Sequence, residues 1–352
     1  MRKHIFGAAT AVALLASVPA TARVVEAAPV GCGSVITAST TLTADVGPCN
    51  QGGLVVQGSG VVLDLGGHTV MGKARVGDGV GVLLQGATGS TVRNGTVTGF
   101  DAGVEVLGGG SNTVTAITAK GNIGGVRSDR DLGDGITIQQ SNGNVVTANV
   151  VTGNGPFSGI SIVDIASNPS LGSAGNVISA NRVVNNNVVA SGAMVDQDDG
   201  IRIEGPNATN TTITGNTVMQ SGLDGIAVFA DQGTGFANTG TTITSNTVAG
   251  NGFHQFAHRK GDGVILFGAP GSTTVRGADG TLVQGNTVQG NAANGVRVAA
   301  RSNTINGNTA TGNDAFPGVT AYDLADTNTT PPCDGNVWSA DTFGTRNQAC
   351  VG

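Results

Sequence analysis

One short motif recurs along most of the chain and constrains its fold more than any other feature. It consists of a turn residue, usually Asp, then Gly, then an apolar–any–apolar triplet. Its copies span residues 78–82, 102–106, 134–138, 158–162, 199–203, 224–228, 262–266 and 294–298. The glycines fall at 79, 103, 135, 159, 200, 225, 263, 295 and 318, so the short steps are 23 to 25 residues and the longer steps contain insertions. An alternating triplet at this period predicts one short β-strand per repeat.

A second motif lies between copies of the first and places an asparagine in an apolar–any–any–Asn–any–apolar stretch. Its asparagines are Asn149, Asn181, Asn216, Asn246, Asn286 and Asn308. If successive repeats stack, these side chains come to lie above one another. Their amides can then hydrogen-bond from coil to coil, so we expect an asparagine ladder at a turn.

Together the two motifs predict an all-β fold, a right-handed parallel β-helix. One coil cannot cover its inward apolar side chains, whereas stacked coils share a continuous core and pair their strands with the coils above and below. Ile201, Ile226 and Val264 are then expected to lie in one file. Glycine contributes 59 of the 352 residues but shows no G-x-y period, which excludes collagen. The single Trp and single Tyr argue against a propeller, whose blades repeat aromatic residues.

The first 27 residues are typical of a secretory signal peptide. Arg2 and Lys3 precede an apolar stretch, residues 5–18, and small residues that allow cleavage after Ala22 or Ala27 follow it. We therefore expect a secreted, extracellular protein. No other segment is long and apolar enough for a membrane helix. The net charge of −6, without a run of Lys or Arg, argues against a nucleic-acid partner.

Four cysteines form two equally spaced pairs near the two ends of the chain. Cys32 and Cys49 are 17 residues apart, and so are Cys333 and Cys350. In an exported protein this spacing predicts two local disulfides, each worth about 3 kcal/mol in the chain-entropy model. The alternatives, four free thiols or a zinc site, fit export and the wide spacing less well. The expected organisation is a signal peptide (1–27), an N-terminal cap with the first coil (28–70), the repeats (71–325) and a C-terminal cap (326–352).

With these features the chain resembles the secreted right-handed parallel β-helix repeat proteins of the pectate-lyase-like superfamily. The resemblance covers roughly residues 32–350 and is strongest at Leu63–Val70 and from Asn336–Trp338 through Cys350. The superfamily contains pectate lyases, polygalacturonases, alginate epimerases and many members without an assigned activity. The resemblance therefore implies a β-helix, and function has to be argued from a site.

One face of the predicted helix offers a surface for a polymer. The middle residue of each first-motif triplet points outward. This gives an expected exposed column of Gly81, Glu105, Thr137, Ser161, Arg202, Ala227, Ile265 and Arg297, and a second column of Leu107, Gln139, Val163, Glu204, Phe229, Phe267 and Ala299. Insertions flank the same strand at residues 122–134, 163–175, 187–199, 229–240, 252–262 and 268–280. A sheet walled by loops forms a groove, which suits a linear polysaccharide.

The middle of this groove is the candidate site. Carboxylates can serve as general acid and base, Arg can bind a uronate, and Phe faces can stack on sugar rings. The candidate catalytic residues are Asp198, Asp199, Arg202 and His258, and the candidate substrate-binding residues are Glu204, Phe229, Phe267 and Arg297. The adjacent Asp198 and Asp199 resemble the Asp-Asp pair of polygalacturonases. The Gly-His-Gly and Arg-Ile-Lys elements of that family are missing, as is the Asp-Pro-His element of alginate epimerases.

Simpler interpretations exist for several of these residues. The Asp of Asp-Gly recurs in most coils, so a turn role is favoured for Asp224 and Asp262. Asp196, Asp198 and Asp199 could hold Ca²⁺, although a solvated acidic loop explains them more simply. His254 and His258 have the spacing of a helical metal site, but nothing indicates a helix there. We expect no metal site and no cofactor other than this candidate Ca²⁺.

These observations lead to two functional hypotheses. The first is a monomeric protein that binds an extracellular polysaccharide, with cleavage or modification by a lyase, hydrolase or epimerase mechanism left open. The alternative is a non-catalytic structural or cell-surface solenoid without a sugar ligand. No complete catalytic set of the resembling families is present, so binding is ranked above catalysis.

Overall fold

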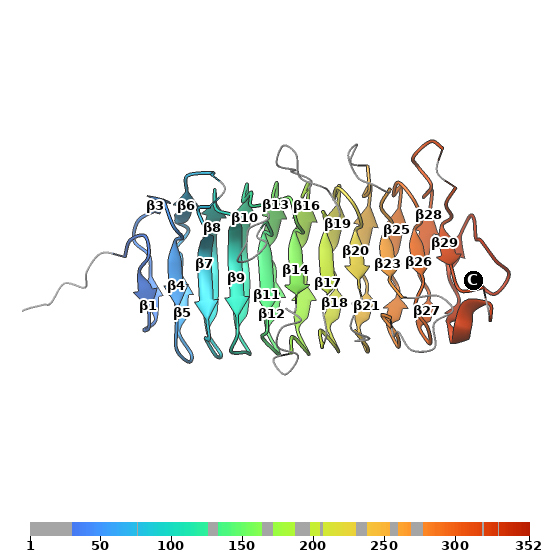
Figure 1. Ribbon diagram of the computed structural model, residues 1–352, viewed down its shortest axis with the longest axis horizontal. Helices are drawn as coiled ribbons and strands as arrows, with labels where there is room; N and C mark the ends of the chain where they lie inside the picture. Colours follow the sequence, from blue (N-terminus) through green and yellow to red (C-terminus); the bar gives the residue numbers. More distant parts are fainter. Residues whose placement is uncertain are drawn as a thin grey trace, which may run out of the picture.

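The structure, a computed structural model, is an elongated stack of coils in which each turn of the chain lies against the turn before it (Figure 1). The strands pair in parallel with strands one coil away, which confirms the predicted parallel β-helix. The structure describes residues 30–75, 77–125, 133–163, 172–186, 198–204, 207–229, 238–253, 260–268, 277–318, 320–329 and 331–352. The expected signal peptide lies outside these residues.

Three columns of strands run along the stack. Sheet A contains β1 (Val35–Ile36), β4 (Leu54–Val56), β7 (Val80–Gln85), β9 (Ala102–Leu107), β11 (Ile136–Gln139), β14 (Ile160–Val163), β17 (Ile201–Glu204), β20 (Ile226–Val228), β23 (Val264–Leu266), β26 (Val296–Val298) and β29 (Leu324–Asp326). The second column contains β2 (Thr40–Thr41), β5 (Val62–Asp64), β8 (Thr91–Thr98), β10 (Thr113–Lys120), β12 (Val145–Thr147), β15 (Val177–Ser179), β18 (Thr212–Thr214), β21 (Thr242–Thr244), β24 (Leu282–Gln284), β27 (Thr304–Asn306) and β30 (Val337–Ser339).

The third column shares the long strands β8 and β10 with the second. Its other members are β3 (Val46–Cys49), β6 (Thr69–Gly72), β13 (Val150–Thr152), β16 (Arg182–Val184), β19 (Thr217–Met219), β22 (Thr247–Ala249), β25 (Thr287–Gln289), β28 (Thr309–Thr311) and β31 (Thr342–Phe343). One short 3₁₀ helix, η1 (Cys333–Gly335), precedes β30. Among the described residues, no helix is long and apolar enough to cross a membrane.

The core is built from files of identical or similar side chains. Ile201 pairs with Ile226, and Ile226 pairs with Val264, so the predicted file is confirmed. All three side chains are fully buried. Burial of one such side chain is worth about 1.5–3 kcal/mol, and the file repeats this contribution at every coil.

A column of glycines lies at the start of the sheet A strands because the stack leaves no room for a side chain there. A Cβ on Gly225 would lie 2.3 Å from Val248 Cγ1 and 2.5 Å from the carbonyl oxygen of Gly263. Similar clashes would occur at Gly103, Gly135, Gly159, Gly200, Gly263 and Gly295. These members of the glycine repeat are therefore a steric requirement of the coil.

The two ends of the predicted glycine column were wrong. Val82, rather than Val80, pairs with Val104, so Gly81 replaces Gly79 in the column and Leu83 replaces Gly81 in the outward column. The segment Gly79-Val80-Gly81-Val82 contains the Gly-Val step of the motif twice, two residues apart. Side-chain alternation cannot distinguish the two registers. In the last coil, the carbonyl group of Asp323 takes the place next to Gly295, and Gly318 lies outside the column.

The predicted asparagine ladder is confirmed. The Nδ2 of Asn216 donates to Oδ1 of Asn246 at 3.0 Å, and Asn246 repeats the contact with Asn286 at 3.0 Å. All six predicted asparagines belong to this ladder, and the rungs are almost completely buried. The Nδ2 of Asn308, the last of them, donates to the carboxylate of Asp341.

Two further ladders were missed from the sequence. One includes Asn112, Asn144 and Asn176 before the second column, and reappears at Asn303 and Asn336. The other follows the third column through Asn122, Asn154 and Asn186, is interrupted at Ser221, and resumes at Asn251, Asn291 and Asn313. Both end on a carboxylate, since Asn336 Nδ2 donates to Asp326 and Asn313 Nδ2 donates to Asp323.

Both predicted disulfides are present, one at each end of the stack. Cys32 and Cys49 close the first coil, because the first precedes β1 and the second ends β3. Cys333 and Cys350 tie η1 to the last residues of the chain, which return along β29 with hydrogen bonds to Leu324. Disulfides persist in oxidising compartments, so they indicate a protein that works outside the reducing cytosol.

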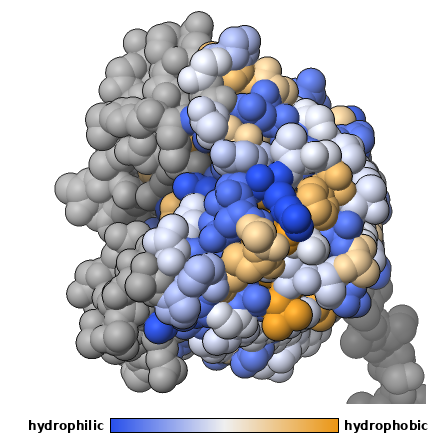
Figure 2. All heavy atoms as spheres, turned by 90° about the vertical axis from the view of Figure 1, so that its right-hand side faces the viewer, coloured by the Kyte–Doolittle hydropathy of each residue, from blue (hydrophilic) through white to orange (hydrophobic). Residues whose placement is uncertain are grey.

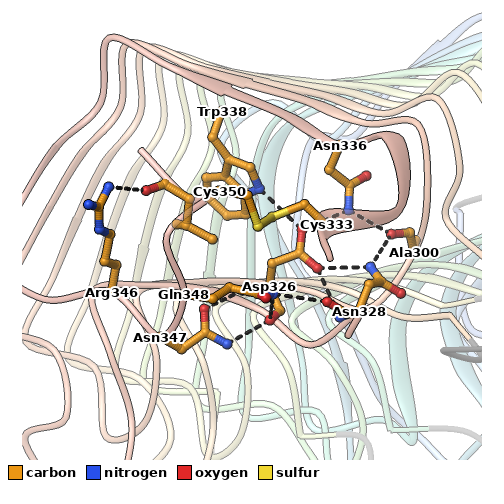
Figure 3. Close-up of a disulfide and its surroundings, with 11 residues drawn as sticks. Ala300, Asp326, Asn328, Cys333, Asn336, Trp338, Arg346, Asn347, Gln348 and Cys350 are labelled. Carbon is orange, nitrogen blue, oxygen red and sulfur yellow. Dashed lines mark hydrogen bonds between the residues drawn. A yellow bond between two sulfur atoms is a disulfide. The ribbon is translucent and has the colours of Figure 1, made fainter. Parts of the chain in front are cut away.

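A buried carboxylate organises the C-terminal end (Figure 3). Asp326 accepts hydrogen bonds from Asn328, from Asn336 Nδ2 at 2.8 Å and from Trp338 Nε1 at 3.2 Å. The end face of the stack carries mostly hydrophilic residues with scattered hydrophobic ones (Figure 2). Backbone hydrogen bonds join Leu324 of β29 to Thr345 and Asn347. The C-terminal residues therefore cover the edge of sheet A, which would otherwise expose unpaired backbone groups.

We predict that Gly225→Ala destabilises the protein by about 1–3 kcal/mol or more, because its Cβ would overlap both Val248 and the next coil. The free energy of unfolding measured in denaturant tests this. Gly31→Ala is the control, since no atom lies within 4 Å of a Cβ at Gly31. Equal stability of Gly225→Ala and the native protein would contradict the steric argument.

Candidate functional site

Two arginines and two phenylalanines stack along one side of sheet A. Arg202 points outward from β17, and its guanidinium lies 3.7 Å from the ring centre of Phe229, just after β20. The rings of Phe229 and Phe267 are stacked with centroids 3.9 Å apart and planes 18° apart. Arg297, on β26, lies 5.5 Å from the centre of the Phe267 ring. We call these four residues the Arg–Phe stack; it crosses four consecutive coils.

Two carboxylates hold the buried end of the stack. Arg202 donates from Nη1 to Asp199 Oδ2 at 2.8 Å and from Nε to Glu204 Oε2 at 2.7 Å. Burial alone would lower the pKa of the Arg202 guanidinium, but the two carboxylates more than offset it, so the pKa is raised and the side chain stays charged. Arg202 is only 5 % exposed, whereas the Glu204 side chain is 31 % exposed. The structure thus brings the predicted residues Asp199, Arg202 and Glu204 into one cluster.

The other end of the stack is more open. Arg297 Nε lies 2.7 Å from Asp262 Oδ2, an ion pair whose angles fall outside those of a hydrogen bond. The Arg297 side chain is 25 % exposed, and Phe229 and Phe267 are half-buried. A ligand can therefore reach the two ring edges and Arg297 from solvent.

The aspartates of the first motif connect coils to each other. Asp199 Oδ1 accepts the backbone N–H of Asp224 at 2.9 Å, and Asp224 Oδ1 accepts that of Asp262 at 2.7 Å. Asp262 Oδ1 in turn accepts the N–H of Asn294 at 2.9 Å. The structural role expected for Asp224 and Asp262 is thus a coil-to-coil ladder. Asp199 belongs to the same ladder and uses its second oxygen for Arg202.

Asp198 takes no part in the cluster that Asp199 forms with Arg202 and Glu204. Its carboxyl group is fully buried, has no hydrogen-bond partner, and packs so closely on Gly222 that a Cβ there would overlap its Oδ2. Burial, with a smaller contribution from the Asp199 charge, raises the pKa of Asp198 to about 9. An Asp-Asp pair of the polygalacturonase kind is therefore not formed. His258 and the expected Ca²⁺ ligand Asp196 lie outside the described residues, as does His254.

The first column expected to be exposed is in fact buried from Gly81 to Ile265, and only its last member, Arg297, reaches solvent. Glu105, Thr137 and Ser161 are at most 1 % exposed, although all three point away from the core. The expected open groove is therefore restricted to the side where Glu204, Phe229, Phe267 and Arg297 reach solvent. Sequence alternation identifies which residues point outward, but it does not show what lies over them.

A carboxyl group missed from the sequence lies next to this column. Burial raises the pKa of Asp134 to about 7, although hydrogen bonds from Ser161 and Ser158 and the charge of Arg202 favour ionisation, and Glu105 adds to the increase. Ser161 Oγ donates to Thr137 Oγ1 at 2.8 Å beside it. Asp134 resembles every other Asp of the motif in sequence, so no local signal marks it. Among the described residues, no three His, Cys, Asp or Glu side chains gather as they would around a metal ion.

We predict that Asp198 makes stability depend on pH. Its folded pKa of about 9 lies above the ordinary value of 3.8, so its contribution is complete below pH 4 and is lost as the pH rises to about 9. Asp198→Asn should therefore flatten the pH dependence of the unfolding free energy over this interval and be more stable than the native protein at pH 9. Denaturant titrations at several pH values measure this. Identical pH profiles would contradict the buried, unpaired placement of Asp198.

The chain is similar to known β-helix proteins in its sequence pattern and in its fold. The family model described as "Right handed beta helix region" matches residues 52–247. No curated protein matches the sequence. Among solved structures, the periplasmic alginate epimerase AlgG is 15 % identical, with 85 % of this chain and 68 % of that chain covered and a TM-score of 0.55. Pectate lyase Pel9A is 11 % identical, with 90 % and 79 % covered and a TM-score of 0.51.

A third structure, the Dettilon tailspike protein gp208, is 18 % identical with a TM-score of 0.48; the alignment covers 90 % of this chain but only 60 % of the tailspike. At these identities the structural likeness shows the fold alone. The family model covers more than half of the chain, and it confirms the right-handed coil expected from the sequence. The chain therefore belongs to the right-handed β-helix family.

Proposed function

We propose that the protein binds an extracellular polysaccharide at the Arg–Phe stack. The observation that carries the proposal is the continuous row of guanidinium and ring faces from Arg202 to Arg297, with one end open to solvent. Strands of successive coils are about 4.8 Å apart, so the four coils of the stack span about 14 Å, the length of a short oligosaccharide. The solved structures named for an alginate epimerase and a pectate lyase support a carbohydrate context.

The chemistry of the stack favours an acidic sugar chain. The ring faces of Phe229 and Phe267 are occupied within the stack, so the two residues offer apolar ring edges to the C–H groups of sugars. Arg297, with its side chain partly exposed, can donate to a uronate carboxylate, while its Nε faces Asp262. Glu204, also partly exposed, can accept from sugar hydroxyl groups beside Arg202.

Catalysis is the second candidate, and Asp134 favours it. A carboxyl group whose pKa is about 7 can take up and release a proton at neutral pH. It lies near Arg202 at the buried end of the same stack. Asp199 is committed to Asp224 and Arg202, and Asp198 has no hydrogen-bond partner, whereas Asp134, itself only 7 % exposed, has a pKa near neutrality and accepts the backbone N–H of Ser158.

The binding proposal predicts that Phe229→Ala and Phe267→Ala each weaken retention of the protein on immobilised pectin or alginate. Each loss of apolar ring contact with the sugar should cost roughly 1 kcal/mol, or about fivefold in affinity, and the double variant more. Affinity electrophoresis in gels that contain each polymer measures the retention. Phe253→Ala is the matched control, because Phe253 is an exposed phenylalanine outside the stack.

Two results would count against polysaccharide binding at this site. Native protein that migrates identically with and without every acidic polymer would favour the alternative of a structural solenoid. Retention that is unchanged in both stack variants but lost in Phe253→Ala would move the binding surface elsewhere.

A further inference from the structure

The second strand column presents an uncharged face over eight consecutive coils. From β10 to β30, the first and third residues of each three-residue unit point outward and the middle residue is buried. In β10 these outward residues are Thr113 and Thr115. None of the sixteen outward positions is charged, and none is aromatic. Elsewhere among the described strands, charged residues do occupy outward positions, for example Arg93 on β8, Lys120 on β10 and Arg182 on β16.

Hydroxyl groups form a regular row on this face. The third residues of five successive coils are Thr115, Thr147, Ser179, Thr214 and Thr244. Ser179 Oγ donates to Thr147 Oγ1 at 2.9 Å, and Thr244 Oγ1 donates to Thr214 Oγ1 at 3.0 Å. The backbone positions of these residues repeat at the strand spacing of about 4.8 Å, while the two bonded pairs of hydroxyls lie closer together, and their mutual hydrogen bonds restrict the rotamers.

The neighbouring row is apolar or carries methyl groups. The first residues of the same strands are Thr, Val or Leu, for example Val145, Val177 and Thr212. The preference of Thr and Val for strands explains part of this composition. It does not explain the missing charge, because the third column of the same coils places Lys120 and Arg182 at outward positions.

We propose that this face adsorbs to ice. A hydroxyl group donates and accepts hydrogen bonds as water does, and a rigid row of hydroxyls carried on regularly spaced strands can order the adjoining water. Methyl groups between hydroxyls order the adjoining water without competing for its hydrogen bonds. Ice does not accommodate ions in its lattice, so a surface that joins it must be free of charge. The absence of aromatic rings argues against a sugar-stacking platform here, in contrast to the Arg–Phe stack.

Growing ice is the probe that tests this proposal. The native protein should partition into a slowly growing ice hemisphere, shape ice crystals into facets and produce a gap between melting and freezing temperatures. Thr212→Lys/Thr242→Lys places two charges on neighbouring coils of the face and should abolish all three effects. Both side chains are partly exposed, so the change spares the core.

Thr217→Lys/Thr247→Lys is the matched control. It adds the same charges to the same two coils, on the third column instead of the second, and should leave the ice effects unchanged. Circular dichroism melts verify that both variants fold. Native protein that is excluded from ice, or an equal loss in both variants, would overturn the proposal. Exclusion of the native protein from ice overturns the proposal even if the first variant fails to fold.

Discussion

The structure depends on hydrogen bonding between parallel coils in one constant register. Each sheet A strand pairs residue for residue with the next, so a coil shifted by one residue would turn its inward side chains to solvent. Insertions between strands are tolerated because they leave the paired segments unchanged. The glycine column is required for this pairing, because a Cβ at any of its positions would overlap the carbonyl oxygen of the next coil. The side-chain ladders then pair polar groups that the corners would otherwise bury without partners.

The candidate site is built partly from residues that also hold neighbouring coils together. The aspartate ladder occupies one oxygen of Asp199 and of Asp262, and the second oxygen of each faces an arginine. Arg202 and Arg297 then hold the two ends of a ring pair that belongs to the intervening coils. The arginines that could bind a ligand are thus held by the same aspartates that link neighbouring coils, so the rigid coils fix their positions.

The repeating parts of this protein could be predicted from its sequence, and the exceptions could not. Ile201, Ile226 and Val264 lie in the expected file and the six asparagines form the expected ladder, because both follow from the period alone. Both cysteine pairs are joined, as their equal spacing in an exported chain predicts. Gly79 was assigned to the wrong position because two registers satisfy the same alternation. Asp198 and Asp199 look equivalent in sequence, yet one is buried on Gly222 and the other pairs with Arg202. Glu105, Thr137 and Ser161 point outward as the alternation predicts, yet they are buried, because alternation gives the direction of a side chain and not its exposure.

The asparagine ladders have a direction. Within each unbroken run, every asparagine donates a side-chain N–H to the carbonyl oxygen of the next, and at the C-terminal end the three ladders finish on Asp341, Asp323 and Asp326. A carboxylate accepts but has no hydrogen to hand on, so each acid works as a stop signal for its row. The three rows therefore end at the C-terminal face, and a second molecule docked against this face would have to bind without continuing them.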